Sequence, residues 1–165
     1  MSPQKGFTHE SQARSVETVW LTPKWVIDRL GPFDLDPCAA PEPRPWATAA
    51  RHITLPEDGL MAPWDGLVWC NPPYGRQVGA WMNRMAMHGN GIALVFARTD
   101  TEWFQKSAEF ASGILFLKGR LQFCTPDGSV PDRASAPSLL MAFGHVARVR
   151  LVTSGLAGAL WEVGK

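Results

Sequence analysis

An unbroken apolar run, GIALVFA at residues 91–97, decides the fold class more than any other stretch of the chain. A strand that has no polar residue on either face must be buried on both, as the central strands of parallel sheets are. A shorter run, LVWC at residues 67–70, has the same character. Two such strands predict the buried sheet of an α/β architecture.

Helices are predicted where apolar residues recur at helical spacing, at residues 22–30, 77–88 and 99–111. Thr22 is expected to cap the first helix, with Pro23 in its first turn. Thr99 or Asp100 is expected to open the third helix.

Further short strands are predicted at residues 33–36, 51–55, 113–117, 121–124, 138–144 and 146–152. The strands at 113–117 and 121–124 are separated by KGR, a spacing typical of a hairpin. Strands alternate with helices early in the chain and follow one another closely later. This order predicts an α/β sheet with an antiparallel end.

The chain has 165 residues, the size of one domain, which we expect to span residues 19–165. Residues 1–18 are polar, lack the apolar core of a secretory signal and are expected to form a flexible tail. No apolar run reaches the ~18 residues that a membrane span requires. We therefore expect a cytoplasmic protein that does not bind membranes.

Three cysteines, Cys38, Cys70 and Cys124, form no CxxC or CxxH pair. This pattern predicts reduced thiols rather than disulfides or a zinc site, and no metal is expected.

Residues 1–66 carry six Lys and Arg against nine Asp and Glu, whereas residues 67–165 carry ten Lys and Arg against six Asp and Glu. A polyanion would be attracted to the second part, although a solvated surface explains the asymmetry equally well.

Asn71-Pro72-Pro73-Tyr74 directly follows the apolar run LVWC and carries the most specific chemistry. Open α/β sheets bind ligands at the carboxyl ends of their strands, where Asn71 is expected to lie. The prolines fix the backbone and lack N–H groups, so the Pro72 carbonyl and the Asn71 amide oxygen form two close acceptors. Such a pair suits an amino group with two hydrogens, and Tyr74 offers a flat face to a planar ring. A plain proline turn is the alternative interpretation.

A second candidate is FDLDPCAA at residues 33–40, which ends a predicted strand at Asp36. The carboxylate is suited to accept from a cationic amine or from ribose hydroxyls, and the small residues after it allow a ligand to approach. Acidic strand ends of this kind are also common in loops. Thr22-Pro23 and Asp58-Gly59 are weaker signals, since an Asp-Gly pair is usually a turn.

A third candidate is ARTDTEWF at residues 97–104, which places Arg98, Asp100 and Trp103 at the same edge. A helix cap with a charged rim explains it as well. Lys118 and Arg120 are expected to face either a phosphate backbone or solvent.

The four histidines have no ligand spacing and are assigned no role. The GxSxG and Walker glycine motifs are absent, so serine-hydrolase and P-loop chemistry have no support.

Six segments in one order resemble the Dam-like family, the small DNA N-6-adenine methyltransferases of phages and prophages. They are TPKWVIDRL, FDLDPCAA, DGLMAPWDGLVWCNPPYG, ARTDTEWFQ, LKGRLQF and PSLLMAF, within residues 20–144. The resemblance implies a Rossmann-like, mostly parallel seven-stranded sheet with helices on both faces and an antiparallel C-terminal edge. It also implies S-adenosylmethionine as methyl donor, adenine in DNA as acceptor, and a phage- or prophage-encoded enzyme in the bacterial cytoplasm.

The resemblance further implies roles for the matching residues. Asn71, Pro72, Pro73 and Tyr74 would form the catalytic motif, with Tyr74 stacked on the adenine. The donor pocket would be lined by Thr22, Pro23, Asp36, Pro37, Cys38, Ala39 and Asp58. Weaker contacts with DNA would come from Arg98, Asp100, Trp103, Lys118 and Arg120. The DNA is expected to be double-stranded, and no obligate protein partner is expected.

Two features leave alternatives open. DPCAAP has alanines and a proline where a methyltransferase usually has a glycine. The NPPY tetrapeptide also occurs in methyltransferases of protein glutamine and of RNA. The alternatives are therefore an enzyme acting on an RNA base or a glutamine, or an inactive nucleic-acid-binding domain of the same fold. Sequence specificity is expected to be modest or to come from loops such as residues 125–137, since there is no room for a separate recognition domain.

Overall fold

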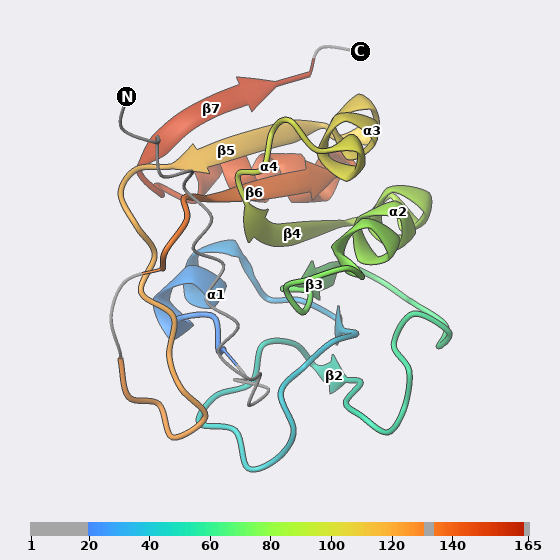
Figure 1. Cartoon of the computed structure of the whole chain (residues 1–165), viewed down its shortest axis with the longest axis vertical. Coiled ribbons are helices and arrows are strands. Elements are labelled where there is room, and N and C mark those ends of the chain that lie inside the picture. Colours follow the sequence, from blue (N-terminus) through green and yellow to red (C-terminus); the bar gives the residue numbers. More distant parts are fainter. Residues whose placement is uncertain (1–19, 131–133, 164–165) are drawn as a thin grey trace, which may run out of the picture.

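The computed structural model describes residues 20–130 and 134–163, in which seven strands form one sheet flanked by four helices (Figure 1). The helices are α1 (Lys24–Leu30), α2 (Val78–His88), α3 (Glu102–Phe110) and α4 (His145–Thr153). The strands are β1 (Leu35–Asp36), β2 (Arg51–His52), β3 (Val68–Cys70), β4 (Gly91–Phe96), β5 (Gly113–Leu117), β6 (Ser138–Phe143) and β7 (Gly158–Glu162). The predicted α/β class and the seven-stranded sheet are confirmed.

The strands lie in the order β2-β1-β3-β4-β6-β5-β7. The pairs from β2 to β4 are parallel, whereas β4–β6, β6–β5 and β5–β7 are antiparallel. The sheet is therefore mixed: β1 to β5 run in one direction, as a mostly parallel sheet requires, but two reversed strands, β6 and β7, make three of the six neighbouring pairs antiparallel. The physical reason is that β6 enters between β4 and β5 in the reverse direction, and β7 adds a second reversed strand at the edge.

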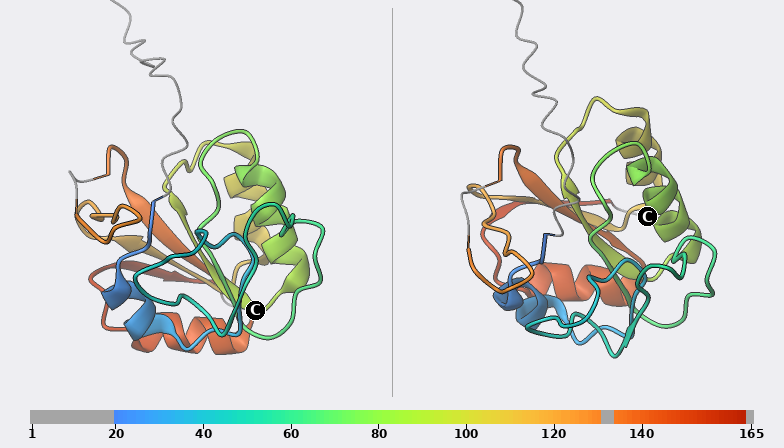
Figure 2. Two further views of the ribbon diagram at one scale, coloured as in Figure 1. Left: turned by 90° about the horizontal axis from the view of Figure 1, so that it is seen from below. Right: turned by 60° about the horizontal axis from the view of Figure 1, so that its bottom comes forward.

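Helices cover both faces of the sheet, as the family resemblance implies (Figure 2). On one face, α2 and α3 bring Trp81 and Phe104 into a core with β3, β4 and β6. On the other face, α1 and α4 contribute Leu30 and Leu151. The strand β4 is buried over its first five residues because it lies between these two layers.

Three predictions for the second half of the chain are wrong. Residues 146–152 alternate like a strand but form most of α4, in which Ala147 and Leu151, four positions apart, are buried. Residues 121–124 belong to the connection from β5 to β6, where Cys124 forms an isolated bridge with Leu21. β5 therefore pairs with β6 and β7 rather than with a hairpin partner, and β7 lies where no strand is predicted.

The starts of two helices also differ from the prediction. Pro23 occupies the N-cap position of α1, so Thr22 precedes the helix instead of capping it. The cap of α3 is Thr101, whose hydroxyl accepts a backbone N–H of the first turn, and not Thr99 or Asp100. The hydroxyl of Thr22 is thereby available for a contact with another part of the chain.

None of the helices in the described part of the chain is long and apolar enough to cross a membrane. The predicted flexible tail, residues 1–18, lies outside the described residues.

Candidate active site

The carboxyl ends of four strands meet at one edge of the sheet. β1, β3 and β4 run parallel, and β5 shares their direction because β4 and β5 are both antiparallel to β6. The residues that end or follow these strands at this edge are Asp36, Asn71, Arg98 and Lys118. Segments that are distant in the sequence therefore converge here, where open α/β sheets bind their ligands.

Asn71 presents its side-chain oxygen at the end of β3. Its side-chain nitrogen donates to the hydroxyl oxygen of Thr22 across 3.3 Å. The amide oxygen is buried and has no hydrogen-bond partner among the described residues. A buried acceptor of this kind costs free energy until a ligand satisfies it. After it, Pro72 is buried and Pro73 is exposed.

The ring of Tyr74 stacks on the ring of Phe96, the last residue of β4. The ring centroids are 4.1 Å apart and the planes differ by 5°. Phe123 meets the same ring nearly perpendicularly at 6.2 Å. Burial raises the pKa of the Tyr74 hydroxyl well above its usual value. Phe96 is absent from the predicted site, although its position at the end of the GIALVFA run was a signal for this edge.

A pocket of about 240 Å³ lies beside the stacked rings. It lies between the Tyr74 loop, the end of β4 and the first turns of α2 and α3. The residues around it include Tyr74, Gly75, Val78, Phe96, Arg98 and Trp103. Its wall therefore combines aromatic rings with one guanidinium, which suits a planar ligand that carries negative charge nearby.

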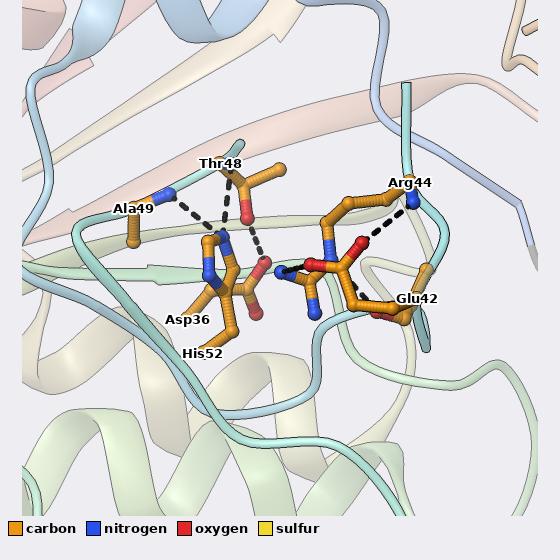
Figure 3. A network of polar contacts seen from close by, with 7 residues as sticks. Asp36, Glu42, Arg44, Thr48, Ala49 and His52 are labelled. Carbon is orange, nitrogen blue, oxygen red and sulfur yellow. Dashed lines mark hydrogen bonds and ion pairs between the residues drawn. The ribbon is translucent and has the colours of Figure 1, made fainter. Parts of the chain in front are cut away.

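Asp36 is 4% exposed, yet it carries an ionisable group. Its carboxylate accepts from the backbone N–H of Cys38 across 3.1 Å. It also accepts from the Thr48 hydroxyl, as Figure 3 shows. Burial raises the pKa of Asp36 from 3.8 to about 6, although these hydrogen bonds and Arg44 act to lower it. A desolvated carboxylate of this kind is stabilised most by a cationic partner.

A polar network holds the loop that carries Thr48 (Figure 3). The Nε2 atom of His52 accepts the backbone N–H groups of Thr48 and Ala49, at 3.2 and 3.3 Å. Burial lowers the pKa of His52, in keeping with the neutral ring that these bonds require. Arg44 and Glu42 form an ion pair of 2.8 Å beside it. Sequence reasoning missed these residues because they match no motif and meet only through the fold of the loop.

The turn after Asp36 packs against the Asp58-Gly59 turn. A Cβ atom on Gly59 would lie 1.8 Å from the carbonyl oxygen of Pro37, so only glycine permits this approach. Asp58 is exposed, and its carboxylate accepts from the backbone N–H of Leu60 across 2.9 Å. The structure thus brings Asp58 near the predicted donor-pocket residues, although its side chain serves its own turn.

Cys38 and Ala39 complete the turn after β1. The backbone N–H of Ala39 donates to the carbonyl oxygen of Ile53 across 3.0 Å. The thiol of Cys38 donates to the backbone carbonyl of Asn71 across 3.3 Å. The predicted donor-pocket turn and the NPPY motif are therefore in direct contact.

The predicted DNA contacts divide into two groups. Arg98 and Trp103 line the pocket. Asp100 is exposed in the turn before α3, and Lys118 and Arg120 are exposed after β5. These three residues lie outside the pocket lining, so the pocket gathers only part of the predicted set.

A family model described as DNA N-6-adenine-methyltransferase (Dam) matches residues 10–154, which is most of the chain. Searches of curated proteins and of solved structures gave no significant match.

Proposed function

This chain belongs to the Dam family of DNA N-6-adenine-methyltransferases, and we propose that it transfers a methyl group from S-adenosylmethionine to the exocyclic amine of adenine in DNA. The observation that carries the proposal is the amide oxygen of Asn71, which is buried and finds no partner in the described part of the chain. An amine with two hydrogens supplies the donor that this oxygen lacks.

The reaction we propose is direct in-line displacement. An aromatic amine is a poor nucleophile because its lone pair is delocalised into the ring. Acceptors at both of its hydrogens favour the tetrahedral nitrogen that develops during attack, so they stabilise the transition state more than the planar ground state. We assign these acceptors to the Asn71 amide oxygen and the Pro72 carbonyl. Alignment of the two substrates provides much of the remaining acceleration.

The adenine is proposed to enter the pocket after rotation out of the duplex. Rotation costs a few kcal/mol, and stacking on an aromatic ring recovers about 1–3 kcal/mol per base. Because Tyr74 is already stacked on Phe96, its ring plane is fixed before the base arrives. Pre-orientation of this kind reduces the entropy lost on binding.

S-adenosylmethionine supplies, when bound, a methyl group on a cationic sulfur together with a cationic amino group. The residues at the end of β1 fit such a ligand, since the carboxylate of Asp36 is buried and its pKa is raised by that burial. We propose that Asp36, with Thr22-Pro23, Pro37, Cys38, Ala39 and Asp58 nearby, forms the donor pocket. A buried carboxylate gains charge stabilisation from a cationic group that displaces its remaining water.

Exposed cations are proposed to hold the phosphate backbone. Lys118 and Arg120 lie in the turn after β5, at the edge that also holds Asn71. Arg98 reaches the same edge from the end of β4, and Asp100 and Trp103 flank it. Double-stranded DNA is the proposed substrate. When a base rotates out of a duplex, the duplex still presents the phosphates that these exposed cations are proposed to contact.

We further propose that residues 19–165 form a single catalytic domain that needs no obligate protein partner. The enzyme is proposed to be phage- or prophage-encoded and to act in the cytoplasm of a bacterial host. The six ordered sequence segments that resemble such enzymes support this assignment.

The decisive experiment is incubation of the protein with methyl-labelled donor and DNA, RNA or protein in turn, followed by identification of the labelled atom. We expect label on adenine N6 in DNA. Label on an RNA base or a glutamine would replace the proposal with one of those activities. Titration of the donor by calorimetry separates an active enzyme from a domain that has lost catalysis.

The Asn71→Ala variant tests the assigned chemistry. It is expected to abolish methylation while donor binding stays largely intact. Asn83→Ala, at an exposed position of α2, is the matched control and should retain activity. Unchanged turnover in Asn71→Ala would contradict the mechanism.

A further inference from the structure

Two free thiols face each other inside the candidate site. Cys38 lies in the turn after β1 and Cys70 is the last residue of β3, 32 positions further along the chain. Their sulfur atoms are 3.7 Å apart. Because β1 and β3 are neighbouring parallel strands, the turn that follows β1 and carries Cys38 lies beside the end of β3 that carries Cys70.

We propose that Cys38 and Cys70 are a site of reversible oxidation, at which a disulfide forms and switches off the neighbouring methyl-transfer site. The cross-link follows from the placement of the thiols alone. Its effect on turnover rests on the proposed function.

The proposed oxidant is a peroxide, one molecule of which oxidises the two thiols to one disulfide. Cys38 is the accessible member, being partly exposed, whereas Cys70 is fully buried. Peroxide first oxidises Cys38 to a sulfenic acid and leaves as water. The Cys70 sulfur then attacks the Cys38 sulfur, an S–S bond forms and a second water departs. Two thiols and one peroxide thus give one disulfide and two waters, and an added dithiol reverses the step.

Closure of the disulfide disturbs both parts of the proposed site. The sulfur atoms must approach from 3.7 Å to about 2.05 Å. Cys38 then loses the S–H that donates to the backbone carbonyl of Asn71. Its backbone N–H also donates to Asp36, so the turn that moves with the sulfur carries that carboxylate with it.

The resting state of the pair is reduced. The hydrogen bond with Cys70 and burial raise the pKa of the Cys38 thiol well above its usual value. A protonated thiol reacts slowly with peroxide, so the cross-link requires oxidative stress rather than ordinary aerobic conditions.

The test is treatment of the purified full-length protein with hydrogen peroxide, followed by alkylation, peptide mapping by mass spectrometry and assays of donor binding and methylation. Cys38→Ala and Cys70→Ala each remove one partner. Cys124→Ala is the matched control, since Cys124 is also buried but lies in the connection between β5 and β6. Mass spectrometry detects the cross-link even if the chain methylates no substrate.

We expect a peptide joining Cys38 to Cys70, a loss of methylation of at least tenfold, and recovery with dithiothreitol. The Cys124→Ala variant should respond like the wild type, whereas both partner variants should lack the joined peptide. Absence of that peptide in the wild type, or its presence without any change in donor binding or methylation, would overturn the proposal. The two proposals can also fail separately. If the untreated wild type methylates no substrate, but peroxide joins Cys38 to Cys70 and alters donor binding, the thiol site is supported and the proposed function is wrong.

Discussion

The side-chain nitrogen of Asn71 donates to the hydroxyl oxygen of Thr22 across 3.3 Å, joining the end of β3 to the residue before the cap of α1. An amide presents an oxygen on one side and a nitrogen on the other, so a partner for the nitrogen determines where the oxygen points. Thr22 therefore orients the group to which we assign the chemistry. This contact gives Thr22 a second role, in addition to the donor contact proposed for it.

Replacing Thr22 with valine tests this orienting role. Thr22 is 2% exposed, and valine keeps its shape but removes the hydrogen-bond acceptor. Loss of one hydrogen bond of about 1 kcal/mol predicts a fall in kcat of roughly fivefold to tenfold. Thr22→Ser retains the hydroxyl and should retain activity. Steady-state kinetics combined with donor titration decide the matter: a weaker donor Kd with unchanged kcat would show that Thr22 acts through the donor pocket and does not orient Asn71.

The hydroxyl of Tyr74 should be dispensable. It is buried and has no hydrogen-bond partner within the described residues, whereas the ring stacks on Phe96. Tyr74→Phe is therefore expected to keep the KM for DNA and to leave the free energy of unfolding unchanged or raised by up to about 1 kcal/mol. Tyr74→Ala should raise the KM for DNA about tenfold or more through lost stacking. Equal damage from both substitutions would show that the hydroxyl, rather than the ring, matters.

The pKa of Asp36 predicts a dependence of stability on pH. The folded protein has a pKa of about 6 at this carboxyl, whereas the usual value is 3.8. As pH falls through 6 toward 4, the folded state takes up the proton first, so the contribution of Asp36 to the free energy of unfolding rises. The gain approaches about 3 kcal/mol below pH 3.8, where folded and unfolded states are both protonated, and it is lost as pH rises from about 4 through 6.

Urea unfolding of wild type and Asp36→Asn between pH 4 and 8 measures this contribution. The difference between the two proteins isolates Asp36, because His52, whose lowered pKa acts in the opposite direction, is present in both. Parallel pH profiles for the two proteins would refute the assignment. Binding of a cationic donor should also weaken below pH 6, by up to about tenfold per pH unit.

The exposed cations after β5 predict a salt-dependent affinity for DNA. The double substitution Lys118→Ala with Arg120→Ala should weaken binding at low salt and reduce the slope of log Kd against log salt by about two. Arg148→Ala is the control, since Arg148 lies beside Gly113 at the opposite edge of the sheet. Fluorescence anisotropy with a labelled duplex measures both, and equal slopes for all three proteins would remove this turn from the DNA interface.

The residues of the candidate site could be predicted where the sequence pattern that indicates them lies within a short stretch of the chain. Asn71 follows an apolar run and Asp36 ends a short predicted strand; a proline comes directly after each, and both lie at the carboxyl edge of the sheet. Phe96, Thr48 and His52 were not singled out, since each reaches the site through pairing or packing with a distant segment. Residues 146–152 were wrongly predicted to form a strand. Their alternating hydrophobicity does not exclude a helix that buries only Ala147 and Leu151.

By itself the sequence determined the fold class, the buried strands and the position of the polar motif at a strand end. These properties follow from local chemistry, since apolar runs must be buried and proline removes a backbone donor. Only the tertiary structure decided that β6 enters between β4 and β5, that Thr22 orients Asn71 and that two cysteines 32 positions apart lie within 3.7 Å. These relationships depend on which segments pair across long loops, and no single stretch of the chain encodes that choice.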